Sequence, residues 1–437
     1  MATRRTALSR RQFITLAGGA AGAAVAGSGF ALAHGNGNGN GVPLAAASSA
    51  VPTAAPTALA TPAPLRTDGR TLIVVTMAGG NDGLNTLVPI NDGRYRDLRP
   101  NLALAESSLL SLGGAPDQAL HPSLAPMSPL WESGQLAALQ AIGLPGQSRS
   151  HFVATDAWSA GGAAHSAEWD SAGGGWLGRW MDATAAGEPN PMRAISLGGG
   201  SRALVGEQSS PVIVASLSEF DLHGMSGDRS LAEAFSAMGS GIDDGLLGAA
   251  RASIPTTVRA VEELTDAFGA PESADPYGEA SVPAMFGAAA DIIEADLGTQ
   301  VIVINMSGFD THANQLAVHA GLLGDLAIGI SALFARLEIS GRADRTLLMS
   351  YSEFGRRVAE NGSGGTDHGS GVAFLVGPAL ARSQVIGDVN LAQLHEGDVA
   401  QSVDSRSLYA NALDWLGGPT AEILGGDWDR YDLLRTT

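Results

Sequence analysis

Side chains that can do acid–base, nucleophilic or metal chemistry follow four apolar segments of this 437-residue chain. They are Asp82 after residues 71–77, Arg149 and Ser150 after 136–142, Asp310 and His312 after 301–306, and Glu353, Arg356 and His368 after 346–351. Each segment has the length and the continuous apolar character of a strand buried on both faces of a parallel sheet. Because ligands bind beyond the carboxyl ends of such strands, we expect these side chains to reach one common rim.

The segment Asp310-Thr311-His312 is typical of a metal-binding loop. Residues two apart point the same way when a loop is extended. An Asp–x–His pair, together with a distant His and further carboxylates, suits Zn²⁺, Mn²⁺ or a similar divalent cation. The alternative is a loop in which Asp310 is only a cap and His312 bonds to the backbone.

These loops need a scaffold of alternating strands and helices. Apolar residues recur at helical spacing from Leu316 to Leu337, which predicts a strand–helix–strand unit with parallel strands. A fifth strand is expected at 373–376, and Asp404 is expected to cap the last helix. The further expected helices cover 122–131, 152–159, 176–184, 253–268, 283–295 and 405–416. The sequence therefore predicts a single α/β domain over 69–437, with three layers (α/β/α) around a mainly parallel central sheet and an insertion of loops and helices around 198–280.

Two absences narrow the chemistry. The chain has no Cys, and all 25 of its basic residues are Arg. These absences exclude disulfides, thiolate metal sites and cysteine nucleophiles, and also the lysines of phosphate-binding loops and of Schiff bases. No G-x-S-x-G elbow supports a metal-free serine hydrolase. Catalysis must use Ser or Thr, His, Asp or Glu, Arg, or a metal.

The chain is acidic, with 44 Asp and Glu and a formal net charge of −19. Residues 1–33 carry four Arg and no acid, so their removal lowers the net charge by four, to −23. A surface this negative repels phosphate backbones, and nucleic acid is therefore not expected as a partner. A charged surface kept for solubility explains the same composition.

Residues 1–33 are typical of a twin-arginine signal peptide. Arg10 and Arg11 precede a mildly apolar run rich in Gly and Ala, which ends in the cleavage pattern Ala31-Leu32-Ala33. Residues 34–68 are rich in Gly, Asn, Ala and Pro and are expected to form a flexible linker. We therefore expect the twin-arginine translocase as a partner during export, no stable membrane span in the mature form, and a periplasmic, cell-envelope or extracellular location.

The residue runs behind the strands also resemble a known family. The runs are GGNDGLN at 79–85, SRSHF at 148–152, GFDTH at 308–312, SEFGR at 352–356 and GTDHG at 365–369. Together they resemble the domain-of-unknown-function family 1501, whose members are twin-arginine-exported bacterial proteins with a fold similar to the alkaline phosphatase and sulfatase superfamily. The resemblance covers residues 70–420 and implies an alkaline phosphatase-like fold.

The superfamily pattern implies a two-metal hydrolase with a Ser, Thr or formylglycine nucleophile. The metal ligands implied by the resemblance are Asp82, Asp310, His312, Glu353 and His368. Glu353 stands where the superfamily commonly has an Asp-His pair, so it would be a replacement ligand, and the second metal is left open. Ser150 matches the nucleophile best and Ser148 next, while Arg149 and Arg356 are candidates to clamp an anionic substrate.

Taken together, the sequence predicts an exported hydrolase of phosphate or sulfate esters that uses one or two divalent cations. Its substrate would be an anionic small molecule or a glycan ester. Because the chain lacks Cys, a sulfatase would need a formylglycine derived from serine. The alternative is a non-catalytic exported binding or assembly protein that keeps the fold with a degraded site, as the replacement at Glu353 suggests.

Overall fold

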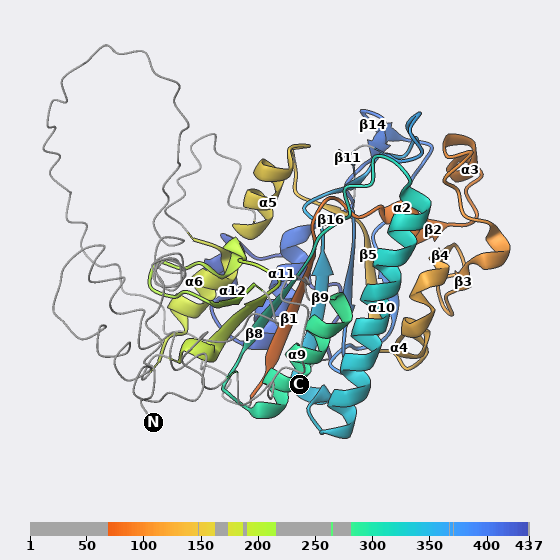
Figure 1. Ribbon diagram of the computed structural model, residues 1–437. Coiled ribbons are helices and arrows are strands. Elements are labelled where there is room, and N and C mark those ends of the chain that lie inside the picture. The colour runs from red at the N-terminus through yellow and green to blue at the C-terminus, as the bar shows by residue number, and fades with distance from the viewer. Residues whose placement is uncertain are drawn as a thin grey trace, which may run out of the picture.

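The computed structural model describes residues 69–146, 148–161, 174–186, 190–215, 264, 281–366, 368–369 and 371–435 (Figure 1). The expected signal peptide, the expected linker and most of the expected insertion lie outside the described residues, as does the expected helix at 253–268 apart from Leu264.

The described part of the chain is built around a nine-stranded sheet of order β13-β5-β12-β9-β1-β8-β6-β7, with β16 beside β5. Its strands are β1 (Thr71–Met77), β5 (Leu136–Gly143), β6 (Ala194–Leu197), β7 (Val212–Val214), β8 (Val301–Met306), β9 (Thr346–Tyr351), β12 (Gly371–Val376), β13 (Gln384–Ile386) and β16 (Val403–Asp404). The four apolar segments that precede the chemical side chains are β1, β5, β8 and β9, and the fifth predicted strand is β12.

The sheet is mainly parallel, as predicted. β1 lies between β8 and β9 and is parallel to both, so the predicted strand–helix–strand unit is confirmed. Among the described strands of this sheet, β12 alone runs the other way, antiparallel to β5 and to β9. The carboxyl ends of β1, β5, β8 and β9 therefore share one rim, and β12 enters the sheet from that rim.

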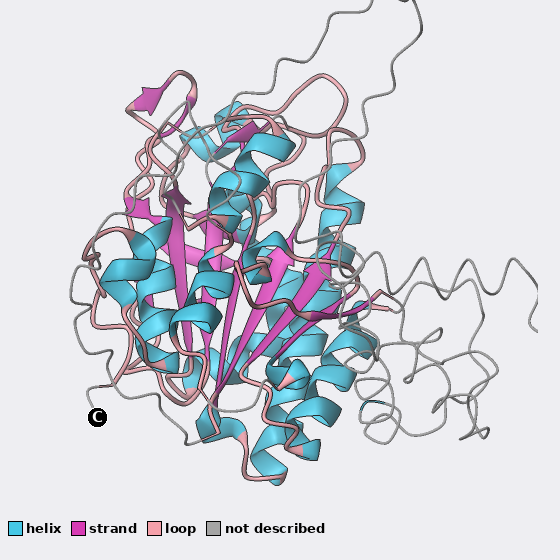
Figure 2. Ribbon diagram, turned by 90° about the vertical axis from the view of Figure 1, so that its left-hand side faces the viewer, coloured by secondary structure: helices cyan, strands magenta, loops and turns pink. Residues whose placement is uncertain are grey.

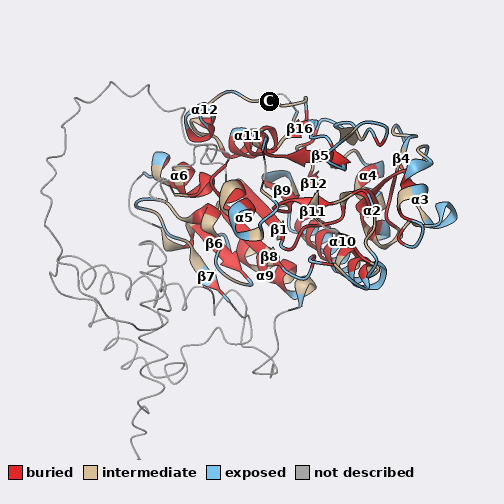
Figure 3. Cartoon of the chain, turned by 90° about the horizontal axis from the view of Figure 1, so that it is seen from above, coloured by how far each residue is buried: buried red, intermediate tan, exposed pale blue. Residues whose placement is uncertain are grey.

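Helices cover both faces of the sheet, because alternate residues of each strand bury apolar side chains on opposite sides. One core contains Ile73 and Val75 and is covered by α9, α10, η2 and α4. The other contains Leu72 and Val74 and is covered by α5, α6, α11 and α12. Viewed from above, the sheet runs between α6, α11 and α12 on one side and α9 and α10 on the other (Figure 3), and Figure 2 shows the strands fanning out behind the helices of one face. The predicted three-layer α/β/α fold is confirmed.

The main helices match the predicted segments closely. They are α5 (His151–Ser159), α6 (Trp176–Ala183), α9 (Val282–Ala295), α10 (Gln315–Ile339) and α11 (Ser405–Leu416). The short helix α12 (Thr420–Leu424) was not predicted. The side chain of Asp404 accepts from the backbone N–H of Arg406 at 2.9 Å, which confirms the expected cap of α11. The segment predicted as one helix at 122–131 is instead a 3₁₀ helix, η2 (Pro122–Met127), followed by α4 (Ser128–Glu132). Prolines within this short span, among them Pro126 inside η2, remove backbone donors and disfavour one continuous helix.

The remaining described elements are short. They are α2 (Gly83–Thr86), β2 (Leu87–Pro89), α3 (Arg94–Leu98), η1 (Glu106–Ser108), β3 (Leu110–Ser111), β4 (Gln118–Leu120), η4 (Pro191–Arg193), η5 (Arg202–Leu204), η6 (Ala343–Arg345), β10 (Gly355–Arg356), β11 (His368–Gly369), β14 (Leu394–His395) and β15 (Asp398–Val399).

Helix α10 is long and apolar enough to cross a membrane by length and composition alone. In this structure it instead packs along α9 and η2, with side chains such as His319, Leu326 and Leu333 buried in the contact. It therefore serves here as the core helix that joins β8 to β9.

Candidate functional site

The loop after β1 folds tightly over the rim because two glycines leave room for its neighbours. Gly79 has a φ of +118°, and a Cβ on it would lie 2.3 Å from the backbone nitrogen of Asp310. Gly80 has a φ of +89°, and a Cβ on it would lie 2.6 Å from the ring of Phe354. Only glycine tolerates both the positive φ and the contact. The β1 loop is thereby pressed against the loops that follow β8 and β9, which brings Asp310 and Glu353 together.

Four polar side chains meet over these loops, namely His151, Asp310, His312 and Glu353, and we call them the strand-end cluster. Nδ1 of His151 lies 2.8 Å from Oε1 of Glu353, and its Nε2 lies 3.6 Å from Oδ2 of Asp310. Nε2 of His312 lies 2.8 Å from Oδ1 of the same Asp310. Asp310 and His312 are about half exposed, whereas Glu353 is buried. The cluster therefore opens to solvent above a buried carboxylate.

Glu353 is held in place from below. The backbone N–H of Gly79 donates to its Oε1 at 2.9 Å, and the hydroxyl of Ser352 donates to its Oε2 at 3.2 Å. His151 is held from the side, because it opens helix α5 and its ring lies 4.8 Å from that of Phe354. A carboxylate fixed in this way also fixes the ring orientation of the histidine that it bonds.

Arg356 joins the loops beneath the cluster. Its side chain is fully buried, Nε donates to the carbonyl of Gly80 at 2.7 Å, and Nη1 donates to that of Thr366 at 2.9 Å. Nη2 donates to the carbonyls of Gly79 and Phe309 and, at 2.8 Å, to Oδ1 of Asp310. The expected role of Arg356 as a substrate clamp does not fit this geometry, because its guanidinium nitrogens donate hydrogen bonds to oxygens of the protein itself. Arg356 is a positioning residue for Asp310.

Asp310 is favoured in its ionised form. Partial burial opposes ionisation, but the hydrogen bond and charge of Arg356, with smaller contributions from His312 and His151, hold its pKa below the ordinary value. A half-exposed carboxylate that stays ionised and contacts two imidazoles is suited to bind a cation.

Asp82 lies beside the cluster but is engaged elsewhere, which departs from its expected role as a metal ligand. Its carboxylate is fully buried and accepts hydrogen bonds from Nη1 of Arg99, at 2.9 and 2.8 Å, and from the side-chain amide of Gln315. It also caps α2, because the backbone N–H groups of Leu84 and Asn85 donate to it. Burial opposes its ionisation, yet the charge and the hydrogen bond of Arg99 hold its pKa below the ordinary value. Asp82 is the anion of a buried ion pair, so its carboxylate has no solvent-facing oxygen for a metal.

This ion pair belongs to a buried polar network that reaches under α10. Nε2 of His319 lies 2.8 Å from Oδ1 of Asn81, and the ring of His319 lies 5.8 Å from that of His121. Burial lowers the pKa of each histidine to about 4, against the attraction of Asp82. Both imidazoles are therefore neutral at physiological pH, and they link β1, η2 and α10 without adding charge.

The other predicted site residues stand at the rim. Ser150 is exposed and directly precedes α5, without a hydrogen bond from its side chain to the helix start. Arg149 is half-exposed and bonds Asp398 at 2.6 Å, so an anion would have to compete with that carboxylate. The backbone of His368 pairs with that of Arg356, which places the residue at the rim, but its side chain lies outside the described part of the structure.

The donor set of the strand-end cluster fits a borderline cation such as Zn²⁺, since it offers imidazole nitrogen and carboxylate oxygen at one half-exposed point. Among the side chains that the structure describes, no group of three His, Asp or Glu is already arranged to hold a metal ion. The imidazoles and carboxylates instead contact each other, as His312 and Asp310 do. Metal binding would exchange these pairs for metal–ligand bonds.

Three residues in or beside the site were not selected from the sequence. His151 lies in the run SRSHF that the resemblance singled out, and its position after β5 was the available signal. Arg99 and Gln315 bond Asp82 from distant segments, and neither stands in a motif. Only the folded chain shows that these two side chains converge.

Comparison with known proteins places the chain in a family. Residues 131–430 match the family described as Protein of unknown function (DUF1501), and the chain belongs to that family, as its motifs predicted. A search of curated protein sequences finds no match.

Solved structures that resemble the chain belong to the alkaline phosphatase and sulfatase superfamily. One is a protein in the alkaline phosphatase superfamily from Vibrio parahaemolyticus, with a TM-score of 0.39, 9% identity, and 83% of this chain and 71% of that chain covered. Another is the PsFucS1 sulfatase from Pseudoalteromonas sp., with a TM-score of 0.37, 12% identity, and 84% and 72% covered. A third is the C-terminal periplasmic domain of EcEptC from Escherichia coli in complex with Zn, with a TM-score of 0.34, 9% identity, and 83% and 87% covered.

Proposed function

We propose that this protein is an exported, metal-dependent hydrolase of phosphate or sulfate esters, and that the strand-end cluster is its active site. The observation that carries the proposal is the contact of one half-exposed carboxylate, Asp310, with the imidazoles of both His151 and His312. Asp310 and His312 follow β8 and His151 follows β5, and the carboxyl ends of parallel strands are where α/β sheets bind their ligands.

In this proposal Asp310, His312 and His151 hold the cation, with His368 as the further ligand that the resemblance implies. A bound divalent cation supplies charge that polarises the ester oxygen and lowers the pKa of the attacking hydroxyl or water. Glu353 orients His151, and Arg356 orients Asp310, so that both ligands are fixed before substrate binds. Ser150 is the proposed nucleophile, one residue before His151. The substrate is an anionic small molecule or a glycan ester, and Arg149 is the guanidinium placed to meet its charge.

Elemental analysis and an ester panel test this proposal. The protein, purified after native export, should contain divalent metal in stoichiometric amount and should hydrolyse at least one phosphate or sulfate ester. Asp310→Ala should lose both the metal and the activity. Asp325→Ala, which removes an exposed carboxylate on the outer face of α10, should keep both. Full metal retention by Asp310→Ala would remove the cluster from the mechanism.

A non-catalytic binding or assembly role is the second candidate, and the burial of Arg356 favours it. A site that acts on phosphate or sulfate esters needs donors that face the substrate, yet the donors of Arg356 bond the protein itself. Metal content separates the two candidates. Protein that contains no divalent cation after native export would support the binding role.

Export by the twin-arginine route is part of the proposal. Arg10 and Arg11 are its basis, and an Arg10→Lys/Arg11→Lys double variant should remain in the cytoplasm. An Arg4→Lys/Arg5→Lys double variant keeps the motif and serves as the matched control. Normal secretion of the first variant would contradict the assignment.

A further inference from the structure

A polar side chain interrupts the otherwise apolar strand β5, away from the strand-end cluster. The strand is buried over its whole length, and Gln140 carries its only polar side chain. Leu136 and Ala138 bury their side chains in the core under α9 and α10, and alternation places Gln140 on the same face of the sheet. An amide at such a position costs stability unless both of its ends are hydrogen-bonded.

Local backbone geometry sets the direction of this side chain. Gly371 of β12 pairs with Ile142 and Val372 pairs with Gln140, so Ala141 is left over as a bulge with a φ of +49°. Bulges of this kind redirect a side chain and are frequent beside functional sites. Nε2 of Gln140 donates to the carbonyl of Gly387 at 3.0 Å. Because only the NH₂ end can donate to a carbonyl, this bond identifies the other end of the amide as oxygen.

That oxygen has no partner. Among the residues that the structure describes, no donor reaches Oε1 of Gln140, although the side chain is only 5% exposed. Oε1 of Gln118 in β4 is likewise buried and unpaired within the described structure. Two buried acceptors without donors lower the stability of the folded chain. A ligand that supplies the missing donors is a physical explanation for the presence of both glutamines.

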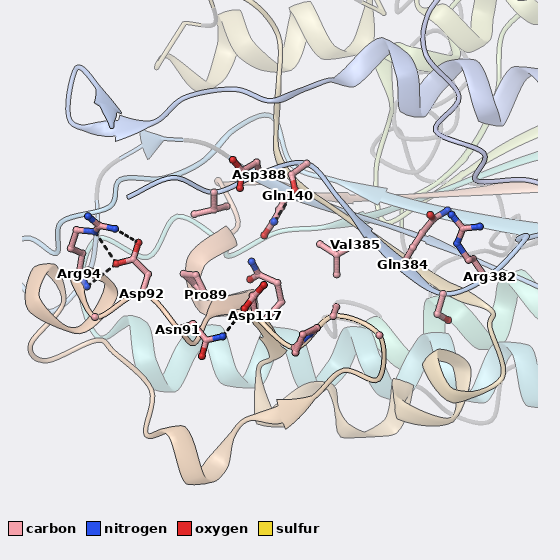
Figure 4. A pocket seen from close by; sticks show the side chains of 18 of the residues that line it. Pro89, Asn91, Asp92, Arg94, Asp117, Gln140, Arg382, Gln384, Val385 and Asp388 are labelled. Atoms are coloured by element: carbon pink, nitrogen blue, oxygen red, sulfur yellow. Dashed lines mark hydrogen bonds and ion pairs between the residues drawn. The ribbon is translucent and has the colours of Figure 1, made fainter. Parts of the chain in front are cut away.

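Both glutamines line one cavity of about 1040 Å³ between β13 on one wall and β2 and β4 on the other. Figure 4 shows the amide of Gln140 turned toward the space between Pro89, Asp117 and Val385, with Asp117 approaching from the opposite wall. None of the residues of the strand-end cluster lines this cavity. It is therefore a separate site.

The walls of the cavity limit the ligand. Its carboxylates are Asp92, Asp97, Asp117 and Asp388, and its guanidiniums are Arg94 and Arg382. Arg94 pairs with Asp92 at 2.8 Å, so carboxylate charge is in excess and an anion is disfavoured. The mostly polar lining does not suit an apolar ligand, and the cavity is far larger than a bare ion.

We propose that this cavity binds a neutral oligosaccharide. Sugar hydroxyls supply the donors that Gln140 and Gln118 lack, and they also bond the carboxylates without needing a counter-charge. Pro89 and Val385 offer small apolar surfaces for the C–H groups of a sugar ring. A cavity that leaves amide oxygens unpaired when it is empty discriminates strongly in favour of ligands with matching hydroxyls. The inference does not depend on the proposed hydrolase activity.

Isothermal titration of the purified full-length protein with maltohexaose, cellohexaose and mannohexaose tests the proposal, with spermine as a cationic comparison. At least one hexasaccharide should bind the wild type. Gln140→Leu should weaken that binding at least tenfold and should melt at the same temperature as the wild type or higher. Gln401→Leu is the matched control, because Gln401 also donates to backbone carbonyls beside β5 but does not line the cavity. It should bind as the wild type does.

Three results would overturn the inference. The first is that no hexasaccharide binds, or that spermine alone binds. The second is equal affinity in the wild type and Gln140→Leu. The third is a Gln140→Leu protein that melts well below the wild type, since the amide would then be a structural bond rather than a binding group.

Discussion

His151 and Glu353 are 202 residues apart in the chain, yet Nδ1 of the histidine lies 2.8 Å from Oε1 of the carboxylate. The contact joins the loop after β5 to the end of β9 and leaves the other nitrogen of His151 facing Asp310 at 3.6 Å. In the proposed site, Glu353 therefore acts through His151.

Glu353→Gln tests that role. The amide keeps the size of the side chain but removes the charge that orients His151. Loss of such a partner typically weakens metal affinity about 10–100-fold. Competition titration with a chelator should show this loss, whereas Glu422→Gln, at an exposed glutamate of α12, should show none. Unchanged affinity in Glu353→Gln would mean that Glu353 does not support the ligands.

Breaking the buried ion pair of Asp82 and Arg99 should strongly destabilise the fold. Both side chains are fully buried, with 2.8 Å between Nη1 and Oδ2. Arg99→Met leaves an uncompensated carboxylate and should lower the free energy of unfolding by about 3–5 kcal/mol. The double variant Asp82→Asn/Arg99→Met should recover part of the loss. Urea unfolding measures both, and a loss below about 1 kcal/mol in Arg99→Met would show that the pair is not held as described.

Stability should fall at mildly acidic pH because of two buried histidines. Burial lowers the pKa of His121 and of His319 to about 4, from an ordinary value of 6.5. Between these pH values the unfolded chain binds protons on both histidines and the folded chain does not, so the free energy of unfolding decreases as the pH falls from 6.5 to 4. Each unit of pKa separation corresponds to about 1.4 kcal/mol, so each histidine contributes on the order of 3 kcal/mol.

His319→Gln is the variant that isolates this effect. Its amide can still donate to Asn81, but it does not titrate, so the slope of stability against pH should decrease by about one proton. Urea unfolding at several pH values from 7 to 4.5 measures the slope. Equal slopes in the variant and the wild type would contradict a neutral, buried His319.

Two glycines of α10 should respond in opposite ways to alanine. A Cβ on Gly329 would lie 2.1 Å from the ring of Phe286 in α9, so Gly329→Ala should destabilise the fold by about 1–3 kcal/mol. Gly321 has nothing within 4 Å of that position, so Gly321→Ala should stabilise the helix by about 0.4–1 kcal/mol. Thermal unfolding of the two variants compares them directly. Equal effects would contradict the close packing of α9 on α10.

The sequence predicted the scaffold well because the scaffold depends on local pattern. Continuous apolar runs of strand length mark β1, β5, β8 and β9, and helical spacing marks α10. The short edge strands β7 and β13 and the small sheet of β2, β4 and β3 carry too few residues for a recognisable period. The antiparallel direction of β12 follows from its entry at the rim, which is a tertiary feature.

The site was predictable only in part. Asp310, His312 and Glu353 of the candidate site could be selected from the sequence because each follows a strand and stands in a motif. The roles of Asp82 and Arg356 could not be read from the sequence, because their partners lie in distant segments. Whether a carboxylate faces solvent or a buried guanidinium depends on which loops pack over it, as Arg99 over Asp82 illustrates.

The most direct test of the proposed site is an anomalous difference map from crystals of the natively exported protein, recorded at the absorption edge of the metal that elemental analysis identifies. The proposal predicts a peak within about 2.0–2.2 Å of Asp310, His312 and His151. A peak at another position, or a protein without metal, would contradict it.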